Sequence, residues 1–351
     1  MVTLKEVAKR ANVSTTTVSY VLNGCDHQVS KETKEKVLEI VKELNYKPNK
    51  IAKSLRTNKT NTIGIIVEDI TVFNTPDIIN GIGDYAEKHG YNIILNNLRV
   101  YKRLGNNYSD VVKCKKNISS LIETILSRET DGIIYIGAHY RDVTGIMDSS
   151  VKPIVYTYCY AGGDSSNWVN FNDEAAAYEV TEYLIGFGHK RIAVITGMVD
   201  SIPCQERLKG YQKAIIDNNL LINPAYVKVG DWQYQSGYTA AKELLSDSLP
   251  PTAIFAMNDL IAGGVIDAAR DMDVKIPEDL SLIGFDNREC SFYYVPKLTT
   301  VEIPLNEMGR LSAQFLVDII ENNKSGNLNA KLKCKLIKRE SVSRISEKFG
   351  M

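Results

Sequence analysis

From Thr62 onward, short apolar runs typical of buried strands alternate with stretches of helical periodicity, and this alternation restricts the fold more than any other feature. The eight apolar runs are TIGIIV, YNIIL, DGIIYIG, KPIVYTY, KRIAVIT, AYVKVG, TAIFAM and LSLIGF. The helical stretches between them include 118–128, 174–186, 206–218, 236–246, 259–270 and 306–322. Such alternation predicts an α/β fold whose parallel sheets are covered by helices on both faces.

Eight strands divide naturally into two doubly wound parallel-sheet subdomains, with a break near YCYAGGDSSNW. In sheets of this kind, ligands bind in a cleft at the carboxyl ends of the strands. Arg207, Trp232, Asn258 and Asp286 each follow such a strand end. The arginine, asparagine and aspartate supply donors and acceptors for hydroxyl groups, and an indole can cover the apolar face of a sugar. Tyr156 of VYTYCY either lines the same cleft or only ends its strand.

The first 60 residues have a different composition, with 12 Lys and Arg against 6 Asp and Glu. Because the whole chain holds 42 of each kind, the remainder is acidic by the same margin, and a basic end on an acidic body indicates a polyanionic partner. Helices are predicted over about 4–11 and 15–22, with a third after a Ser30 cap, and Thr3 and Glu6 have capping-box spacing. Three short helices, the first two joined by a tight turn, are typical of a helix-turn-helix module.

The second predicted helix, within VSTTTVSYVLN, carries a row of hydroxyl side chains. At 100° per residue, the hydroxyl side chains fall within an arc of about 140°, and the valines and the leucine fall opposite. The members of the polar arc are Thr15, Thr16, Ser19 and Tyr20, with Thr17 at its border. Hydroxyl groups can contact both base edges and phosphates. The alternative is a solvated polar face without a partner, and the basic surroundings favour DNA.

The stretch TLKEVAKRANVSTTTVSYVLNG, followed by VSKETKEKVLEIVKELNYKPNKIAKSLR, closely resembles the DNA-binding head of LacI/GalR-family transcriptional regulators. The resemblance implies that Thr15, Thr16 and Tyr20 contact bases in the major groove. Further DNA-binding positions that it implies are Thr3, Thr17, Ser19, Asn23, Asn49 and Ala52. Tyr20 stands where the family often has arginine, and tyrosine cannot make the bidentate guanine contact of arginine. We therefore expect an operator half-site that differs from the commonest pattern of the family.

The stretch YKPNKIAKSLRTNKT connects the head to the rest of the chain. Pro48 ends the third helix, and Asn49 can cap a short new one. A helix this short is marginal in water, so a flexible polar linker is the alternative when no DNA is bound. The resemblance implies a hinge helix that becomes ordered on operator DNA, with Leu55 wedged into the minor groove at the centre of the site. Such a wedge kinks the duplex.

The resemblance covers nearly the whole chain and implies a periplasmic-binding-protein-like core that binds an effector and forms a homodimer. The implied domains are a helix-turn-helix domain at 1–46, a hinge helix and linker at 47–61, and the core at 62–351. Within the core, subdomain one is expected at about 62–158 and 290–320, and subdomain two at about 159–289 and 325–342. The resemblance also places Arg207, Asn258 and Asp286 at effector-contacting positions, and Trp232 at an aromatic one.

Two features of the core depart from the family pattern. Members commonly carry an NPFF-like turn before the first core helix, whereas this chain has ITVFNTPDIINGI, with Asn74 and Thr75 in the place of the aromatic residues. The connection at 99–117 is also longer and more basic than usual. We therefore expect an unusual pocket wall in subdomain one, to which Asn74 contributes. Asp259 is expected to cap a helix rather than to bind a ligand.

Enzymatic function is not expected. The four histidines show no HxH or HExxH spacing, and neither a GxxxxGK[ST] nor a GxSxG motif is present. The six cysteines are scattered without a CxxC pair, which favours free thiols in a reducing cytoplasm over a disulfide framework. Neither a metal site nor a cofactor is expected.

A solute- or sugar-binding protein of the periplasmic-binding type, without a regulatory role, is the alternative function, because it would share the core fold. It would need an export signal and no basic head, and the sequence has the opposite features. No run approaches the roughly 18 apolar residues of a membrane span. The sequence therefore predicts a cytoplasmic, homodimeric, ligand-responsive repressor. Its expected partners are a pseudo-palindromic operator DNA and a small polar effector such as a sugar.

Overall fold

The structure is a computed structural model, and it describes residues 2–22, 24, 29–46, 59–105, 111–127, 130–147, 152–162, 166–322 and 327–345. The chain forms two compact units, Met1–Thr60 and Asn61–Met351. Each unit has a hydrophobic core of its own. The first unit is called the head below, and the second is called the core unit.

The head contains the three predicted helices, α1 (Leu4–Ala11), α2 (Thr15–Leu22) and α3 (Lys31–Glu43). The capping box is confirmed, because the Thr3 hydroxyl accepts a hydrogen bond from the backbone of Glu6 while the Glu6 carboxylate accepts one from the backbone of Thr3. The Ser30 hydroxyl caps α3 as predicted. The small core of the head consists of Val7, Ala8, Ala11, Val18, Val21, Val37 and Ile40.

The first lobe of the core unit is a six-stranded parallel sheet in the order β11-β5-β4-β3-β1-β2. Its strands are β1 (Thr62–Val67), β2 (Asn92–Asn97), β3 (Gly132–Ile136), β4 (Ile154–Thr157), β5 (Asn167–Phe171) and β11 (Asn329–Leu332). Its helices are α5 (Thr75–Lys88), α6 (Val100–Leu104), α7 (Val111–Leu126) and α13 (Leu305–Asn322). The first lobe therefore combines early and late segments of the chain.

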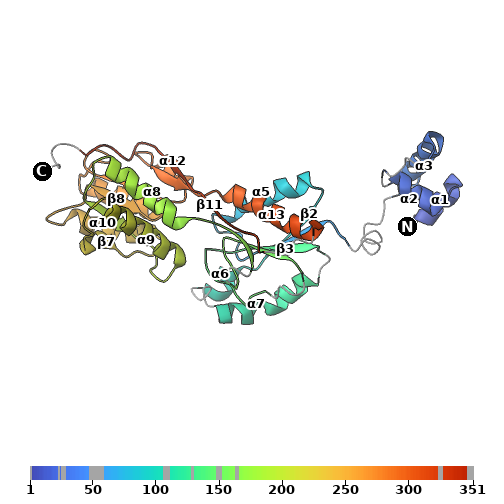
Figure 1. Cartoon of the computed structure of the whole chain (residues 1–351), viewed down its shortest axis with the longest axis horizontal. Helices are drawn as coiled ribbons and strands as arrows, with labels where there is room; N and C mark the ends of the chain where they lie inside the picture. The colour runs from blue at the N-terminus through green and yellow to red at the C-terminus, as the bar shows by residue number, and fades with distance from the viewer. Residues whose placement is uncertain are drawn as a thin grey trace. The chain divides into compact units, whose positions relative to one another are not determined.

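Helices cover both faces of this sheet, which explains its continuous apolar runs. In β3, Ile134 and Ile136 pack in the cluster of α5 and α13, whereas Ile133 and Tyr135 pack in the cluster of α7. Figure 1 shows α5 and α13 side by side. Their backbones approach closely at Gly81, where an added Cβ would overlap the carbonyl oxygen of Asn306.

The second lobe is a four-stranded parallel sheet in the order β7-β6-β8-β9. Its strands are β6 (Ile192–Ile195), β7 (Val227–Lys228), β8 (Ala253–Ala256) and β9 (Ser281–Ile283). Its helices are α8 (Asp173–Gly186), α9 (Ile202–Asp217), α10 (Tyr234–Leu245), α11 (Asp259–Asp271) and α12 (Cys290–Tyr293). Helix α8 packs against α9, and α10 packs against α11, so the two pairs cover opposite faces of the sheet.

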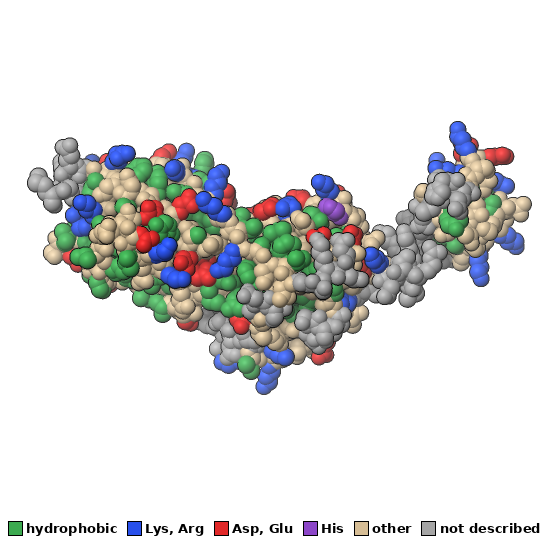
Figure 2. Space-filling view, in the orientation of Figure 1, with side chains coloured by type: hydrophobic (Ala, Val, Ile, Leu, Met, Phe, Trp, Pro, Cys, Tyr) green, Lys and Arg blue, Asp and Glu red, His purple; other side chains and the backbone are tan. Residues whose placement is uncertain are grey.

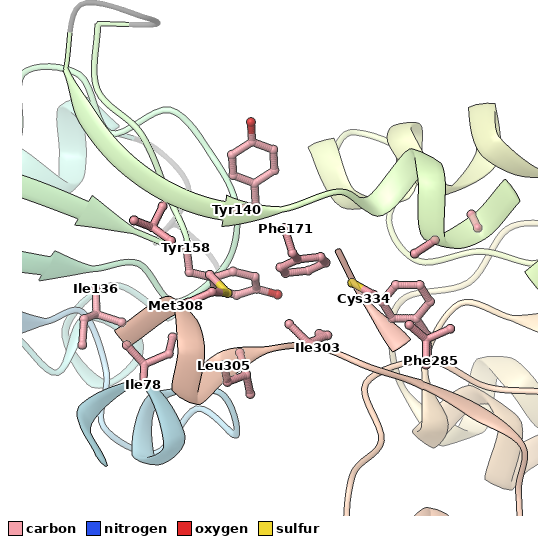
Figure 3. Packing of buried hydrophobic residues seen from close by; sticks show 14 of the residues in the cluster. Ile78, Ile136, Tyr140, Tyr158, Phe171, Phe285, Ile303, Leu305, Met308 and Cys334 are labelled. Carbon is pink, nitrogen blue, oxygen red and sulfur yellow. The ribbon is translucent and has the colours of Figure 1, made fainter. Parts of the chain in front are cut away.

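The chain crosses between the lobes three times. It crosses from β5 to α8, from β10 (Thr300–Glu302) to α13, and from β11 to β12 (Lys335–Ile337), and β10 pairs with β12 in an antiparallel ribbon. An apolar core continues through this crossing region. Figure 3 shows Phe171 between Tyr158 and Phe285, with ring centroids 5.6 Å and 6.5 Å from that of Phe171.

The strand pairing corrects the expected subdomain boundaries. The expectation placed 159–289 and 325–342 in subdomain two, but β5 pairs with β4 and β11 pairs with β5 in the first lobe. It also placed 290–320 in subdomain one, but α12 packs on α11 in the second lobe. Asparagine and lysine interrupt the apolar pattern of NWVNF and NAKL, so periodicity did not reveal these two strands.

Helix α7 begins at Val111, earlier than the 118 expected, and the expected end at Arg128 lies outside the described residues. Within the described part of the chain, none of the helices is both long enough and apolar enough to cross a bilayer.

Candidate nucleic-acid interface and ligand cavity

Helix α2 presents the expected hydroxyl face to solvent. Thr15, Thr16 and Tyr20 are exposed, while Ser19 and Thr17 are half-buried. Thr17 is also partly engaged within the head, because its backbone N donates to the Ser14 hydroxyl at 3.0 Å and the two hydroxyl oxygens lie 2.9 Å apart. The geometry of the arc is thus confirmed, and the DNA contacts of its members stay predictions.

Basic side chains surround the described part of the head. Figure 2 shows Lys and Arg side chains projecting from its surface. The exposed ones are Lys5, Lys9, Arg10, Lys31, Lys36, Lys42 and Lys59. Four expected DNA-binding residues lie outside the described residues, namely Asn23, Asn49, Ala52 and Leu55. The hinge helix expected at 47–61 therefore stays a prediction.

A cavity of about 220 Å³ lies between the lobes, at the carboxyl ends of the strands of both sheets. Four of the six expected effector residues line it, namely Arg207, Trp232, Asn258 and Asp286. The first lobe contributes Phe73, Tyr101, His139 and Tyr158. The volume is below the roughly 300–1,000 Å³ of pockets for drug-sized ligands, which suits a small ligand.

Arg207 is the most heavily engaged residue of the cavity wall, although only 2% of its surface is exposed. Its Nε donates to Asp173 Oδ1 at 2.6 Å, one terminal NH group donates to the backbone carbonyl of Met257, and Asp286 Oδ1 lies 3.8 Å from that group. The guanidinium also stacks on Phe285 at 3.6 Å from the ring centre. These contacts fix the donor geometry that the arginine offers to the cavity.

The carboxyl groups around Arg207 have raised pKa values. Burial raises the pKa of Asp173 to about 6, although Arg207 opposes the shift. Burial also raises the pKa of Asp286, against the lowering effect of Arg207 and Arg288. Burial disfavours the cation of Arg207 itself, yet Asp173 and Asp286 raise its pKa above the usual value. The positive charge of Arg207 is therefore offset by the carboxyl groups beside it, and the wall does not present a strongly cationic surface to the cavity.

Asn258 and Trp232 are joined by a direct hydrogen bond. The Asn258 side-chain amide donates to the Trp232 carbonyl at 2.9 Å, while its Oδ1 accepts from the backbone of Ile261 at 2.8 Å and caps α11. The expectation that Asp259 caps this helix is therefore wrong by one residue. Asp259 lies in the first turn, where it accepts from Thr300 Oγ1 at 2.5 Å and from the backbone of Arg288 at 2.7 Å.

Three residues of the cavity wall have left-handed backbone conformations, with φ values of 59° at Tyr158, 70° at Trp232 and 103° at Asp286. Such conformations cost residues other than glycine about 1–3 kcal/mol each. At Trp232 the indole packs directly on Gly197, where an added Cβ would overlap the ring. The other seven described non-glycine residues with positive φ lie outside the cavity wall, and six of them are asparagine or aspartate, which tolerate this conformation better than tyrosine or tryptophan. One of these six, Asn287, follows Asp286 directly.

Two expected effector residues do not line the cavity. Tyr156 is buried against Tyr135 in the cluster of α7, because the alternation of β4 turns it, like Ile154, toward that face of the sheet. Tyr158, left-handed directly after the strand, lines the cavity. Asn74 is fully buried where α5 begins, and its neighbour Phe73 takes the wall position. Both assignments are corrected accordingly.

Sequence reasoning missed several residues of the site, of which Asp173 and Arg288 are the most important. Asp173 was missed because strand β5 before it was missed, although the turn NDEA after an apolar run is a signal for a strand followed by a capped helix. Arg288 stands only two residues after Asp286 in GFDNRE and lines the cavity. Its position so close to Asp286 in the sequence could have indicated that Arg288 belongs to the cavity wall.

The wall offers hydrogen-bond donors, acceptors and aromatic surfaces. Burial lowers the pKa of His139 to about 4, so this wall residue is neutral at pH 7. Behind it, Glu68 and Arg141 form a buried bidentate pair with both N–O distances at 2.6 Å. Among the described residues, no three His, Cys, Asp or Glu side chains are grouped so that they could hold a metal ion.

The comparisons with known proteins agree with this architecture. The sequence pattern of bacterial regulatory proteins of the lacI family matches residues 3–49, and that of a periplasmic binding protein-like domain matches residues 181–342. The HTH-type transcriptional repressor PurR of Aliivibrio fischeri is 32% identical over 98% of this chain and 99% of its own length. Catabolite control protein A of Priestia megaterium is 35% identical over 90% of this chain and 91% of its own.

Solved structures agree in fold. A lac repressor dimer bound to operator and the anti-inducer ONPF has a TM-score of 0.78 at 28% identity, and covers 97% of this chain and 99% of its own. A complex of the transcriptional regulator CelR with cellobiose has a TM-score of 0.68 at 28% identity, over 97% and 100% of the two chains. The chain belongs to the LacI family. It is a transcriptional repressor with a ligand-binding core, not an enzyme.

Proposed function

We propose that the protein is a cytoplasmic homodimer that binds a pseudo-palindromic operator through two heads and responds to a sugar or sugar derivative in the core cavity. The observation that carries the effector part is the cavity itself, where Arg207, Asn258 and Asp286 converge beside the Trp232 indole. A buried polar wall with one aromatic face suits a molecule with many hydroxyl groups. Related structures with cellobiose and with ribose support a carbohydrate.

In the head, we assign the base contacts to Thr15, Thr16 and Tyr20. Thr3, Thr17 and Ser19 are assigned supporting contacts, and the hinge with Leu55 is assigned the minor groove. Support comes from the exposed hydroxyl arc of α2 and from the basic side chains around it. The dimer is supported by the lac repressor structure, which is a dimer on its operator.

The operator part is tested by selecting bound sequences from random DNA with the full chain and then measuring affinity at several salt concentrations. Tyr20→Ala should weaken the selected operator by about 1–3 kcal/mol and leave non-specific DNA binding nearly unchanged. Leu38→Ala is the matched control, because Leu38 on α3 is exposed to a similar extent, 43% against 39% for Tyr20. Equal losses of operator affinity in the two variants would refute the assignment of Tyr20 to the DNA interface.

The effector part is tested by titrating mono- and disaccharides while indole fluorescence and melting temperature are recorded. The chain has two tryptophans, Trp168 and Trp232, and only Trp232 lines the cavity. Trp232→Phe should remove most of the fluorescence change, and Trp168→Phe should retain it. Binding of a different chemical class, with no response to any saccharide, would refute the carbohydrate assignment.

A further inference from the structure

The cavity is bridged by two side chains from opposite lobes. Phe73 lies in the turn between β1 and α5 of the first lobe, and Arg288 follows β9 of the second. The guanidinium carbon of Arg288 lies 4.0 Å from the centre of the Phe73 ring, and both residues line the cavity. A guanidinium over an aromatic face is attracted by the negative potential of the ring. This contact therefore opposes separation of the lobes at the cavity.

Arg288 is held in place from within its own lobe. Its backbone N donates to Asp259 Oδ2 at 2.7 Å, and its Nε lies 3.3 Å from Asp286 Oδ2, to which it donates. One quarter of its side chain is exposed, so most of the side chain is shielded from water. Because the arginine is anchored on one side only, opening of the core would break its contact with Phe73 and preserve its contacts with the two aspartates.

Other contacts between the lobes differ from this one. Lys331 of β11 donates to Glu206 of α9 at 3.1 Å, but this pair is more exposed, and exposed ion pairs contribute little. The tilted rings of Phe171 and Phe285 lie where the chain itself crosses between the lobes. The Phe73–Arg288 contact combines a shielded charge with a position on the cavity wall.

We propose that Phe73 and Arg288 form a latch whose strength sets the balance between open and closed forms of the core. Two-lobed folds of this kind open and close as rigid bodies about their crossing segments. A ligand that fills the cavity competes with Arg288 for the face of the Phe73 ring. The free energy of the Phe73–Arg288 contact is therefore subtracted from the free energy of ligand binding. The proposal concerns the balance between the two forms, and it holds whatever the chemical class of the effector.

The test uses the full chain without added ligand, in a Trp168→Phe background where Trp232 is the single indole. Opening exposes Trp232, so acrylamide quenching of its fluorescence reports the open fraction. Arg288→Met keeps the side-chain length and removes the charge, and Phe73→Leu keeps an apolar group and removes the ring. Loss of a partly exposed contact between a cation and a ring should raise the ratio of open to closed molecules about fivefold. Each variant should therefore raise the quenching constant.

A double variant tests whether the two residues act together. Since they form one contact, Arg288→Met with Phe73→Leu should raise quenching no further than either change alone. Arg344→Met is the matched control, because the Arg344 guanidinium carbon lies 5.7 Å from the centre of the Phe187 ring within the second lobe, and neither residue lines the cavity. Unchanged quenching in the single variants, additive effects in the double variant, or an equal rise with Arg344→Met would each overturn the proposal.

Hydrogen exchange separates opening from unfolding in the same variants. Opening should accelerate exchange in the wall segments 72–73 and 231–233, and should leave the amides of β8 and α11 protected. Faster exchange throughout β8 and α11 would mean that the substitutions loosen the second lobe, and the latch would then be refuted.

Discussion

The guanidinium Nε of Arg207 on α9 lies 2.6 Å from Oδ1 of Asp173 at the start of α8, and the exposed fractions of the two side chains are 3% and 0%. The same arginine lines the ligand cavity. Its charge therefore joins two packed helices of the second lobe while its donors face the site. We therefore expect both ligand recognition and the stability of that lobe to depend on this side chain.

Replacing Arg207 by methionine should lower the free energy of unfolding by about 3–5 kcal/mol, because the buried Asp173 carboxyl would lose the arginine that pairs with it, while Asp286 would keep Arg288. Urea denaturation of the full chain, followed by circular dichroism, measures this loss.

Lys209→Met is the matched control for that change. Lys209 donates to Glu174 at 2.6 Å between the same two helices, but 70% of its side chain is exposed. Its loss should cost no more than about 1 kcal/mol. Similar losses for the two variants would contradict the special role of the buried pair.

A pH dependence should arise at Asp259. Burial, with the neighbouring Asp286 carboxylate, raises the pKa of Asp259 to about 8 in the folded chain, against about 3.9 in an unfolded one. The folded state thus binds the Asp259 proton more tightly than the unfolded state does. The resulting contribution to the free energy of unfolding is complete below about pH 4 and is lost as the pH rises through 8. In urea titrations at pH 5 and pH 8, Asp259→Asn should lose less stability than the wild type. Parallel losses would contradict the assignment.

The position of the Trp232 indole should depend on Gly197. An alanine there would overlap the ring, so the indole must move out of its place in the cavity wall. Gly197→Ala should therefore shift the emission of Trp232 and lower stability by about 1–3 kcal/mol. Gly186→Ala, at a glycine with open space around its Cβ position, should do neither. An unchanged emission spectrum in Gly197→Ala would contradict the prediction that the indole position depends on Gly197.

The contact between α5 and α13 gives a prediction with a control on the same helix. Gly81→Ala should destabilise the first lobe by about 1–3 kcal/mol, because its Cβ would overlap the backbone of Asn306. Two residues further along, Gly83 has nothing within 4 Å of its Cβ position. Gly83→Ala should be neutral or stabilising by up to about 1 kcal/mol, since alanine favours a helix. Thermal unfolding of both variants distinguishes these outcomes.

Local sequence patterns predicted those parts of the fold that depend on neighbouring residues. The capping box at Thr3 and the buried run of β1 follow from side-chain chemistry within a few positions, and both are present. Strand β11 was missed because its partner β5 lies some 160 residues earlier, and the pairing that stabilises both is invisible to periodicity. Long-range pairing therefore limited the prediction of the lobes.

The same limit applied to the cavity. Residues that follow well-predicted strands were identified correctly as wall residues, namely Asp286 shortly after β9 and Arg207 in α9, the helix that follows β6. Tyr156 was misplaced because the alternation of β4 turns it toward α7, and the cavity position is taken by Tyr158, which is left-handed directly after the strand. A backbone conformation of this kind is set by tertiary contacts, since tyrosine has no intrinsic preference for it.

The three crossings between the lobes have a consequence for inheritance. The first lobe contains α13 and β11, which come from the last part of the chain. The second lobe contains still later residues, because Arg339 donates to the carbonyl of Leu298 and Ser341 donates to that of Leu282. Neither lobe is a continuous stretch of the gene. A single recombination event between two relatives would therefore create a hybrid lobe with mismatched packing. Effector specificity in this architecture is expected to change mainly by point substitution in the wall, while whole heads, which are continuous, can be exchanged in one step.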